Sequence, residues 1–214
     1  MKKYFKKFGI MFVMLLAMIG VGVIQDGSVA NAATVGQQLT SAESGWTRYD
    51  DTYSGIKFDG SFGDSKIPSL YNGAEKVSSH TGDKIKFYAY CNKLRIIASK
   101  SSNRYNNNHM EVFIDGKSAG KINTYYSNLL PQTLLFDYSF SDLSVHYIEI
   151  KNISTDGRYA LLDAIDINKD GQILSWIDES VKLDKNTLDM NTKDSKTLIG
   201  TVKSYKYTTE NITW

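Results

Sequence analysis

Short runs of alternating apolar and polar residues cover most of the chain, and turn-forming residues separate them. The alternation is clear in Ile56–Asp59 and Ile85–Tyr90, and it recurs in Val145–Ile150. The mainly apolar run Leu94–Ala98 is a candidate central strand. Further strand-like runs are Met110–Ile114, Ala119–Ile122, Thr133–Phe136 and Tyr159–Ile167. Because these runs follow one another about every 10–15 residues without a long helical pattern between them, they predict an all-β, antiparallel sandwich.

Two polar turns stand out between these runs. Asp115-Gly116 lies between two strand-like runs, and this pair favours the positive φ angles of a tight hairpin turn. The segment Asn168–Gly171 also predicts a turn, with Gly171 at positive φ. We expect the first turn to close a hairpin, and residues 172–174 could pair back as a hairpin after the second turn.

The N-terminal segment is predicted to be an export signal. It begins with four Lys residues among its first seven positions and continues with an apolar stretch from Ile10 to Ile24. The stretch is shorter than the about 20 residues of a membrane-spanning helix, and Ala30-Asn31-Ala32 matches a signal-peptidase site. We expect cleavage after Ala32, which makes residues 1–32 a signal peptide and residues 33–44 a polar leader. An uncleaved N-terminal anchor remains the alternative.

Removing the signal changes the charge of the chain. The whole sequence carries net +2, but four Lys and one Asp lie in residues 1–32, so the remainder carries net −1. A nearly neutral protein lacks the strongly basic surface that binds nucleic acids or anionic lipids. The charge therefore argues against nucleic acids and anionic lipids as partners. No other apolar run is long enough to cross a bilayer, so we expect no membrane insertion after cleavage. We expect the mature protein to be secreted, either extracellular or attached to the cell surface.

A single cysteine limits the chemistry of the chain. Cys91 has no intrachain partner for a disulfide, and one Cys cannot build a Cys-based zinc site. It follows the strand-like run Phe87–Tyr90, so we expect it to be a small buried residue rather than a nucleophile.

Three motifs in order give the first indication of a family. They are Trp46–Thr52 at the start of the strand-rich region, Val112–Gly116 in its middle and Leu161–Ile167 near its end. Their order resembles the galactose-binding-like jelly-roll modules of secreted clostridial-type surface proteins and glycosidases. The resemblance implies a jelly-roll sandwich over residues 45–174 that holds carbohydrate.

The C-terminal part has a different character. Residues 175–180 are predicted to be a linker, and residues 181–214 resemble the first part of a bacterial Ig-like domain of group 2. The resemblance rests on Lys196–Val202, where Gly200 replaces the usual Ala, and on the Asn211–Trp214 ending. It implies an incomplete Ig-like β-sandwich.

No motif predicts catalysis. The sequence contains no nucleophile elbow, no His-Glu-x-x-His and no phosphate-binding loop, and no Ser–His or Cys–His pair is indicated locally. Asp163 and Asp166 are three positions apart, so on a strand they would face opposite ways, which disfavours a glycosidase pair. We therefore predict that the chain is not an enzyme, with no catalytic residues and no cofactor.

Two acidic segments could bind calcium, but a structural role is favoured for both. Asp166–Ile173 matches part of a calcium loop, yet Ile177 stands where such a loop needs a bidentate carboxylate. Asp50 and Asp51 could bind calcium or a sugar hydroxyl, or they could tie the first strand to a neighbouring loop. We predict no metal site, and a structural ion near Asp50 or Asp166 remains open.

The candidate binding residues centre on the polar loop Ser99–Asn108. Amide and guanidinium groups suit paired sugar hydroxyls, and Tyr rings can stack on a pyranose. We expect Arg104 to be the central donor, on an exposed loop. The complete set of predicted ligand-binding residues is Arg104, Asn106, Asn108, Tyr71, Tyr125 and Arg158. A solvated loop without a ligand is the alternative.

Together these features predict an exported, non-catalytic binding module. Its expected partner is a glycan or polysaccharide at a cell surface, with surface proteins as further partners. The alternatives are a structural or adhesion protein that acts through protein contacts, and the targeting appendage of a larger glycosidase.

Overall fold

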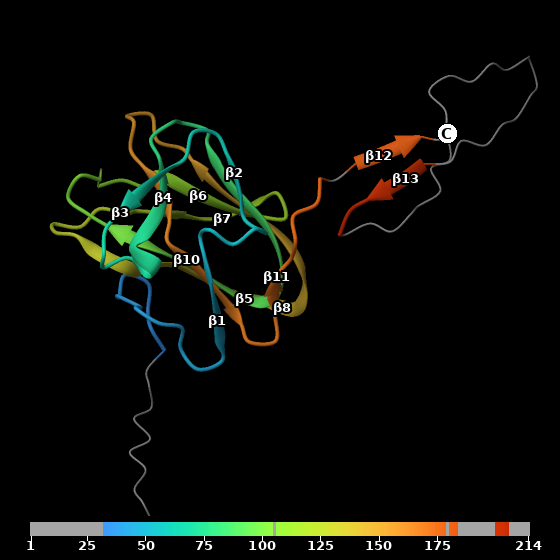
Figure 1. Cartoon of the computed structure of the whole chain (residues 1–214), viewed down its shortest axis with the longest axis horizontal. Coiled ribbons are helices and arrows are strands. Elements are labelled where there is room, and N and C mark those ends of the chain that lie inside the picture. Colours follow the sequence, from blue (N-terminus) through green and yellow to red (C-terminus); the bar gives the residue numbers. More distant parts are fainter. Residues whose placement is uncertain (1–31, 105, 179, 184–199, 206–214) are drawn as a thin grey trace, which may run out of the picture. The chain divides into compact units, whose positions relative to one another are not determined.

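The computed structural model describes residues 32–104, 106–178, 180–183 and 200–205. The larger sheet is antiparallel and has the strand order β1-β10-β5-β8-β6-β7, with β2 and β11 also paired to β5. A smaller antiparallel sheet has the order β3-β4-β9. Its strands β3 and β4 are labelled in Figure 1. The strands are β1 (Trp46–Asp50), β2 (Lys57–Asp59), β3 (Gly63–Lys66), β4 (Ala74–Ser78), β5 (Lys84–Lys100), β6 (Met110–Ile114), β7 (Lys117–Ile122), β8 (Leu130–Asn152), β9 (Ala160–Leu162), β10 (Ala164–Asn168) and β11 (Gln172–Ile173), and a 3-10 turn covers Tyr71–Gly73. The predicted all-β, antiparallel sandwich is confirmed.

Both sheets contribute to one main apolar core. Phe87 and Ile148 from the larger sheet and Leu161 from the smaller sheet are fully buried in the same cluster. Burying one such side chain contributes about 1.5–3 kcal/mol. Cys91 is buried in this core as predicted, and burial raises the pKa of its thiol to about 12, so the thiol is not reactive near neutral pH.

Two long strands form the centre of the larger sheet. The runs predicted as separate strands, Ile85–Tyr90 and Leu94–Ala98, are the two halves of β5. The β5–β8 register shifts between Cys91 and Lys93, and again at two later points. Each shift changes which side chains face the core, which is why the alternation breaks in the sequence although the strand continues.

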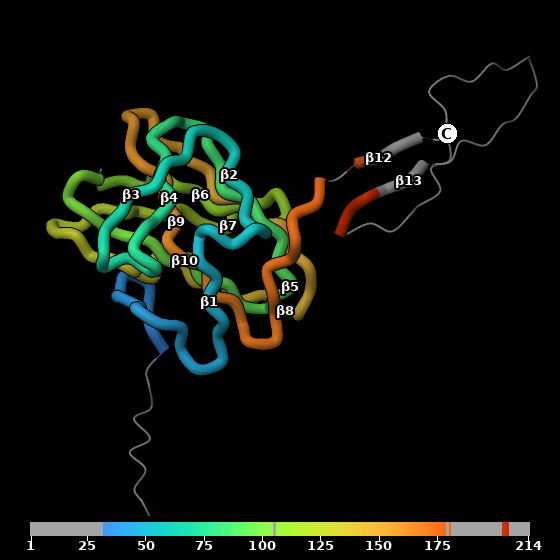
Figure 2. The backbone as a smooth tube through the Cα atoms, in the orientation of Figure 1, coloured from blue at the N-terminus to red at the C-terminus, as the bar shows by residue number. Residues whose placement is uncertain are grey.

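The segment 33–44, predicted to be a polar leader, packs against the sandwich (blue tube in Figure 2). Leu39 is buried in a second apolar cluster with Ile97, Leu134 and Ala164. Backbone hydrogen bonds run from Gly36 N to Leu134 O at 2.8 Å and from Leu39 N to Gln132 O at 2.7 Å. We call this segment the N-terminal strap. It covers strands that would otherwise expose apolar side chains, among them Ile97 of the predicted strand Leu94–Ala98.

The two predicted turns have different outcomes. Asp115 has φ 53° and Gly116 has φ 77°, so the positive φ angles predicted there are confirmed. The prediction for Gly171 is wrong, because its φ lies outside the left-handed region. Gly171 is required for another reason: a Cβ atom there would lie 2.5 Å from the carbonyl oxygen of Tyr90. The glycine allows a close approach of two backbones.

Beyond β11, the chain forms a second antiparallel pair, β12 (Ser180–Leu183) with β13 (Gly200–Lys203). The segment before β12 was predicted to be a linker, and its Trp176 ring centre lies 5.5 Å from the ring centre of Tyr88. The ring centre of Tyr205, which follows β13, lies 5.1 Å from that of Tyr88. Residues 184–199 and 206–214 lie outside the described part, so the Ig-like resemblance stays a prediction. The signal peptide, apart from Ala32, also lies outside it. Within the described part, no helix is long and apolar enough to cross a membrane.

Candidate functional site

A pocket of about 240 Å³ lies beside the smaller sheet, where the loop after β5 meets β3 and β4. The loop side is polar and carries Ser101, Asn103 and Arg104. Tyr159 contributes an aromatic wall just before β9. The remaining lining residues are Asp64, Ser65, Ile67, Val77, Ser99 and Leu129. A pocket with one aromatic wall and several convergent polar groups is typical of a small-ligand site.

Arg104 is the central charged group of this pocket. The sequence predicted an exposed loop residue, and that expectation is wrong, because Arg104 is only 8% exposed. Its guanidinium lies 4.8 Å from the Tyr159 ring centre, and its Nη2 lies 3.7 Å from Glu75 Oε1. The Nε of Arg104 has no hydrogen-bond partner among the described residues. A buried donor without a partner is costly, so this atom marks where a ligand oxygen can bind.

Glu75 on β4 holds Arg104 in place. Its carboxylate is fully buried and accepts hydrogen bonds from Ser99 N at 2.9 Å and Ser99 Oγ at 2.6 Å. Burial raises the pKa of Glu75, while the Ser99 bonds and the Arg104 charge lower it. Burial also lowers the pKa of Arg104. Glu75 was not predicted from the sequence, because Ala74–Ser78 shows no clear alternation of apolar and polar residues. The available signal was an acidic residue within a segment that forms a strand.

The loop that carries Arg104 is held on both sides. Ser101 N donates to Thr124 O at 3.0 Å, and Arg104 N donates to Ser101 O at 3.2 Å. Buried His109 contacts Thr124 Oγ1 at 2.8 Å through Nε2 and Asn107 O at 3.0 Å through Nδ1. Burial lowers the pKa of His109, which favours the neutral ring. These bonds position the loop before any ligand binds.

The other predicted binding residues lie around this pocket or away from it. Arg158 Nη1 donates a hydrogen bond to Asn103 O at 3.1 Å. Tyr125 is 37% exposed, and its backbone forms an isolated β-bridge with Ser101. Asn106 accepts a hydrogen bond from Asn123, and Asn108 is exposed on the same loop. The structure brings these four residues near the loop but not into the pocket lining.

Tyr71 is not brought to this site. Its ring lies 5.4 Å from the Arg48 guanidinium, and the side chain packs against the second apolar cluster beneath the N-terminal strap. Sequence alone could not separate Tyr71 from Tyr159, because both precede short strands. Tyr159 is therefore the aromatic residue that lines the pocket, and Tyr71 belongs to a structural cluster.

The acidic pair at the end of β1 makes structural bonds. Asp51 Oδ2 accepts from Lys76 N at 2.7 Å, and Asp50 Oδ2 accepts from Asn72 Nδ2 at 2.7 Å. Nearby, Asp163 accepts from Tyr71 N at 3.0 Å. Burial is the largest cause that raises the pKa of both Asp51 and Asp163 to about 7. These bonds tie β1 to a neighbouring loop and strand, as the structural interpretation of the pair predicts.

Asp166 also has a structural partner. Its two carboxylate oxygens accept from Arg48 Nε at 2.7 Å and Arg48 Nη2 at 2.8 Å. The oxygens that would begin the candidate calcium loop therefore face a guanidinium. In the described ranges, no group of three or more His, Cys, Asp or Glu side chains could hold a metal ion.

A polar triplet that sequence reasoning missed lies at the β6–β7 turn. His146 Nε2 lies 3.0 Å from Ser144 Oγ, and its Nδ1 lies 2.9 Å from Asp115 Oδ2. Phe140 stacks on the His146 ring at 3.8 Å. The separation of Asp115 from the other two residues hides the arrangement in the sequence. In this arrangement His146 can accept the proton of the Ser144 hydroxyl while Asp115 orients the ring, as in enzymes with an activated serine. The same contacts also hold the β6–β7 turn against β8.

We compared the chain with known proteins, and the solved structures that match it have low sequence identity. No protein-family model and no curated protein matches the sequence. The family two carbohydrate esterase from Cellvibrio japonicus gives a TM-score of 0.47 at 17% identity and covers 61% of this chain and 35% of its own. This chain thus spans about a third of that esterase's length.

Two smaller modules also align. A family 35 carbohydrate binding module from Clostridium thermocellum gives a TM-score of 0.44 at 10% identity, covering 57% of this chain and 98% of the module. The CBM36-1 domain of a xylanase from the hindgut metagenome of Trinervitermes trinervoides gives 0.40 at 15% identity, covering 57% and 96%. These values are too low to transfer a function to this chain.

Proposed function

We propose that the chain is an exported module that binds carbohydrate without catalysing a reaction. The observation that carries the proposal is the buried Arg104 guanidinium, whose unpartnered Nε lies in a pocket beside the Tyr159 ring. An aromatic face accepts the apolar face of a sugar ring, and a fixed guanidinium fork donates to neighbouring hydroxyls.

The pocket dimensions suit a small part of a glycan. Its volume of about 240 Å³ is below the about 300–1,000 Å³ of sites for drug-sized ligands. One sugar unit of a longer chain therefore fits it better than an oligosaccharide does. A single site of this kind binds weakly, and repetition or attachment to an enzyme supplies avidity.

Export and the glycan partner complete the proposal. Cleavage after Ala32 would release the sandwich outside the cell, where glycans of a wall, a host surface or a polysaccharide are available. The alternative is an adhesion or spacer protein that acts through protein contacts. That alternative predicts no glycan bound in the Arg104 pocket.

The proposal is tested with Arg104→Lys. Lysine keeps a positive charge near Glu75 but lacks the guanidinium fork, so glycan binding should weaken by about 1.5–3 kcal/mol, the cost of a lost bond to a charged group. Glycan-array screening followed by titration calorimetry on a retained glycan measures the effect. Thermal melting of the same samples checks the fold.

Asn107→Ala is the matched control, because Asn107 is exposed on the same loop and does not line the pocket. It should bind like the unchanged protein. Equal binding by Arg104→Lys would contradict the assignment of the pocket. Failure of the unchanged protein to retain any glycan would favour the adhesion alternative.

A second candidate function is hydrolysis of an acyl ester, favoured by the Ser144–His146–Asp115 contacts. In that reaction Ser144 Oγ attacks the acyl carbon and its proton passes to His146 Nε2, which then protonates the leaving alcohol. Water releases the acyl group in a second step, and Asp115 holds the His146 ring in position.

A fluorophosphonate probe tests the second candidate. The unchanged protein should be labelled at Ser144 and should hydrolyse p-nitrophenyl acetate above the background rate, while Ser144→Ala should do neither. Mass spectrometry locates the label. Absence of labelling in the unchanged protein would leave these three residues with the structural role of holding the turn against β8.

A further inference from the structure

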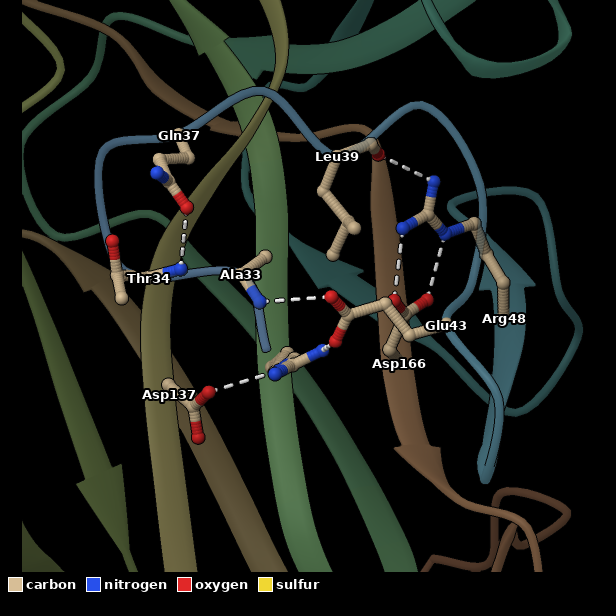
Figure 3. A network of polar contacts seen from close by, with 9 residues as sticks. Ala33, Thr34, Gln37, Leu39, Glu43, Arg48, Asp137 and Asp166 are labelled. Atoms are coloured by element: carbon tan, nitrogen blue, oxygen red, sulfur yellow. Dashed lines mark hydrogen bonds and ion pairs between the residues drawn. The ribbon is translucent and has the colours of Figure 1, made fainter. Parts of the chain in front are cut away.

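The N-terminal strap ends in a polar network on the side of the larger sheet that carries the second apolar cluster (Figure 3). Ala33 N donates to Glu43 Oε1 at 2.8 Å. The other oxygen of Glu43 accepts from Arg95 Nη1 at 2.6 Å, and Arg95 Nε donates to Asp137 Oδ2 at 2.9 Å. The Arg95 guanidinium also stacks 3.9 Å from the Trp46 ring centre. Glu43 is thus held in a fixed orientation that presents one oxygen to Ala33.

The charges in this region do not balance. Three ion pairs in this region join the carboxylates of Glu43, Asp137 and Asp166 to two guanidiniums, those of Arg48 and Arg95. Asp166 and Arg95 face each other in the β10–β5 register, so the Arg48 pair belongs to the same surface. These ion pairs between described residues therefore contain one more negative charge than positive charge. Partly buried carboxylates of this kind are stabilised by an additional positive charge.

Ala33 is the residue that can supply this charge. Cleavage after Ala32, which the sequence predicts, turns the Ala33 peptide nitrogen into an α-ammonium. Ala32 is exposed, whereas Ala33 is half-buried and packs against the second apolar cluster.

We propose that Glu43 and Arg95 form a binding site for the chain's own Ala33 α-ammonium, which signal cleavage creates. The proposal rests on the predicted cleavage and is independent of carbohydrate binding. Before cleavage, Ala33 offers Glu43 one neutral N–H donor. After cleavage, the same nitrogen carries a full positive charge, and a charge-assisted hydrogen bond is about twice as strong as a neutral one.

The geometry of the strap prepares the nitrogen for this contact. Thr34 N donates to Gln37 Oε1 at 2.9 Å, and Gln37 N donates to Thr34 O at 3.0 Å. These bonds form a turn that fixes Ala33 next to Glu43 before the charge appears. Cleavage therefore fastens the free end of the strap over Leu39 and the apolar cluster beneath it. The mature chain becomes more stable than its precursor.

Three versions of the protein test the site. The first is chain 33–214 with a free Ala33 amine, and the second is chain 32–214, which moves the amine by one residue. The third is Nα-acetylated 33–214, which keeps one N–H donor at Ala33 but carries no positive charge there. We expect the second and third to melt roughly 2–4 °C below the first. Scanning calorimetry measures the melting temperatures.

Glu43→Gln in the free and acetylated forms completes a double-mutant cycle. The free amine should no longer raise the melting temperature, because the carboxylate that binds it is gone. Equal melting of the free and acetylated forms, or a difference that persists in Glu43→Gln, would overturn the site. The acetylation comparison needs no substitution, so it remains decisive if Glu43→Gln folds poorly.

The processing step has a separate test. Intact mass of the exported protein should correspond to a chain that begins at Ala33. Another N-terminus would overturn the link to cleavage. Neither result depends on whether the Arg104 pocket binds a glycan.

Discussion

Replacing Asp166 with alanine should lower the free energy of unfolding by about 3–5 kcal/mol, the usual cost of leaving one partner of a buried ion pair alone. The Arg48 and Asp166 side chains are 4% and 0% exposed and make two parallel hydrogen bonds. The change leaves a guanidinium with no carboxylate against it beneath the N-terminal strap. Urea denaturation with a fluorescence readout measures the effect, which is a large share of the about 5–15 kcal/mol typical of a domain.

Asp64→Ala is the matched control for this experiment. Asp64 also pairs with a cation, Lys76 at 2.6 Å, but its side chain is 46% exposed. An exposed pair contributes about 0–1 kcal/mol, so the control should unfold almost like the unchanged protein. Similar losses for the two variants would mean that burial of the Asp166 pair does not determine its contribution.

Stability should fall as the pH rises from about 4 to 7. Asp51 and Asp163 have pKa values of about 7 in the folded protein, against about 3.9 for an unperturbed Asp. Between these values the folded state holds more protons than the unfolded state, so raising the pH favours unfolding. The slope is about 1.4 kcal/mol per pH unit for each carboxyl. For the two carboxyls together, the unfolding free energy should be about 5 kcal/mol lower at pH 7.5 than at pH 5.

Asp51→Asn isolates this effect. The amide oxygen can still accept the hydrogen bond from Lys76 N, but the side chain no longer titrates. The variant should show a shallower pH dependence in urea denaturation than the unchanged protein. Glu75, with its raised pKa, acts in the same direction, and buried His109, with its lowered pKa, acts in the opposite one. An unchanged slope in Asp51→Asn would contradict the assignment to this carboxyl.

The sequence predicted strands best where one face meets the core and the other meets water. Met110–Ile114 is observed as β6 with the predicted bounds, because its side chains alternate between buried and half-buried. β3 and β4 were not predicted, since Gly63–Lys66 and Ala74–Ser78 contain few apolar residues. Their pairing with each other and with β9 depends on segments distant in the sequence.

The candidate site was predicted in part. The polar loop after Leu94–Ala98 was identified, and Arg104 within it lines the pocket. The depth of Arg104 and its partner Glu75 could not be predicted, because Glu75 reaches the loop from the smaller sheet, across the core. The positions of Tyr71 and Tyr159 depend on the same packing.

Local patterning by itself determined the all-β class, the Asp115-Gly116 turn and the burial of Cys91, because alternation and turn chemistry act between near neighbours. Tertiary structure alone decided which polar residues meet. It brought Asp115 to His146, Asp166 to Arg48 and Glu43 to Ala33, and it turned the polar segment 33–44 into a strap. The physical reason is that ion pairs and buried hydrogen bonds join residues whose strands become neighbours only when the sheets pair and pack, and no sequence spacing encodes that proximity.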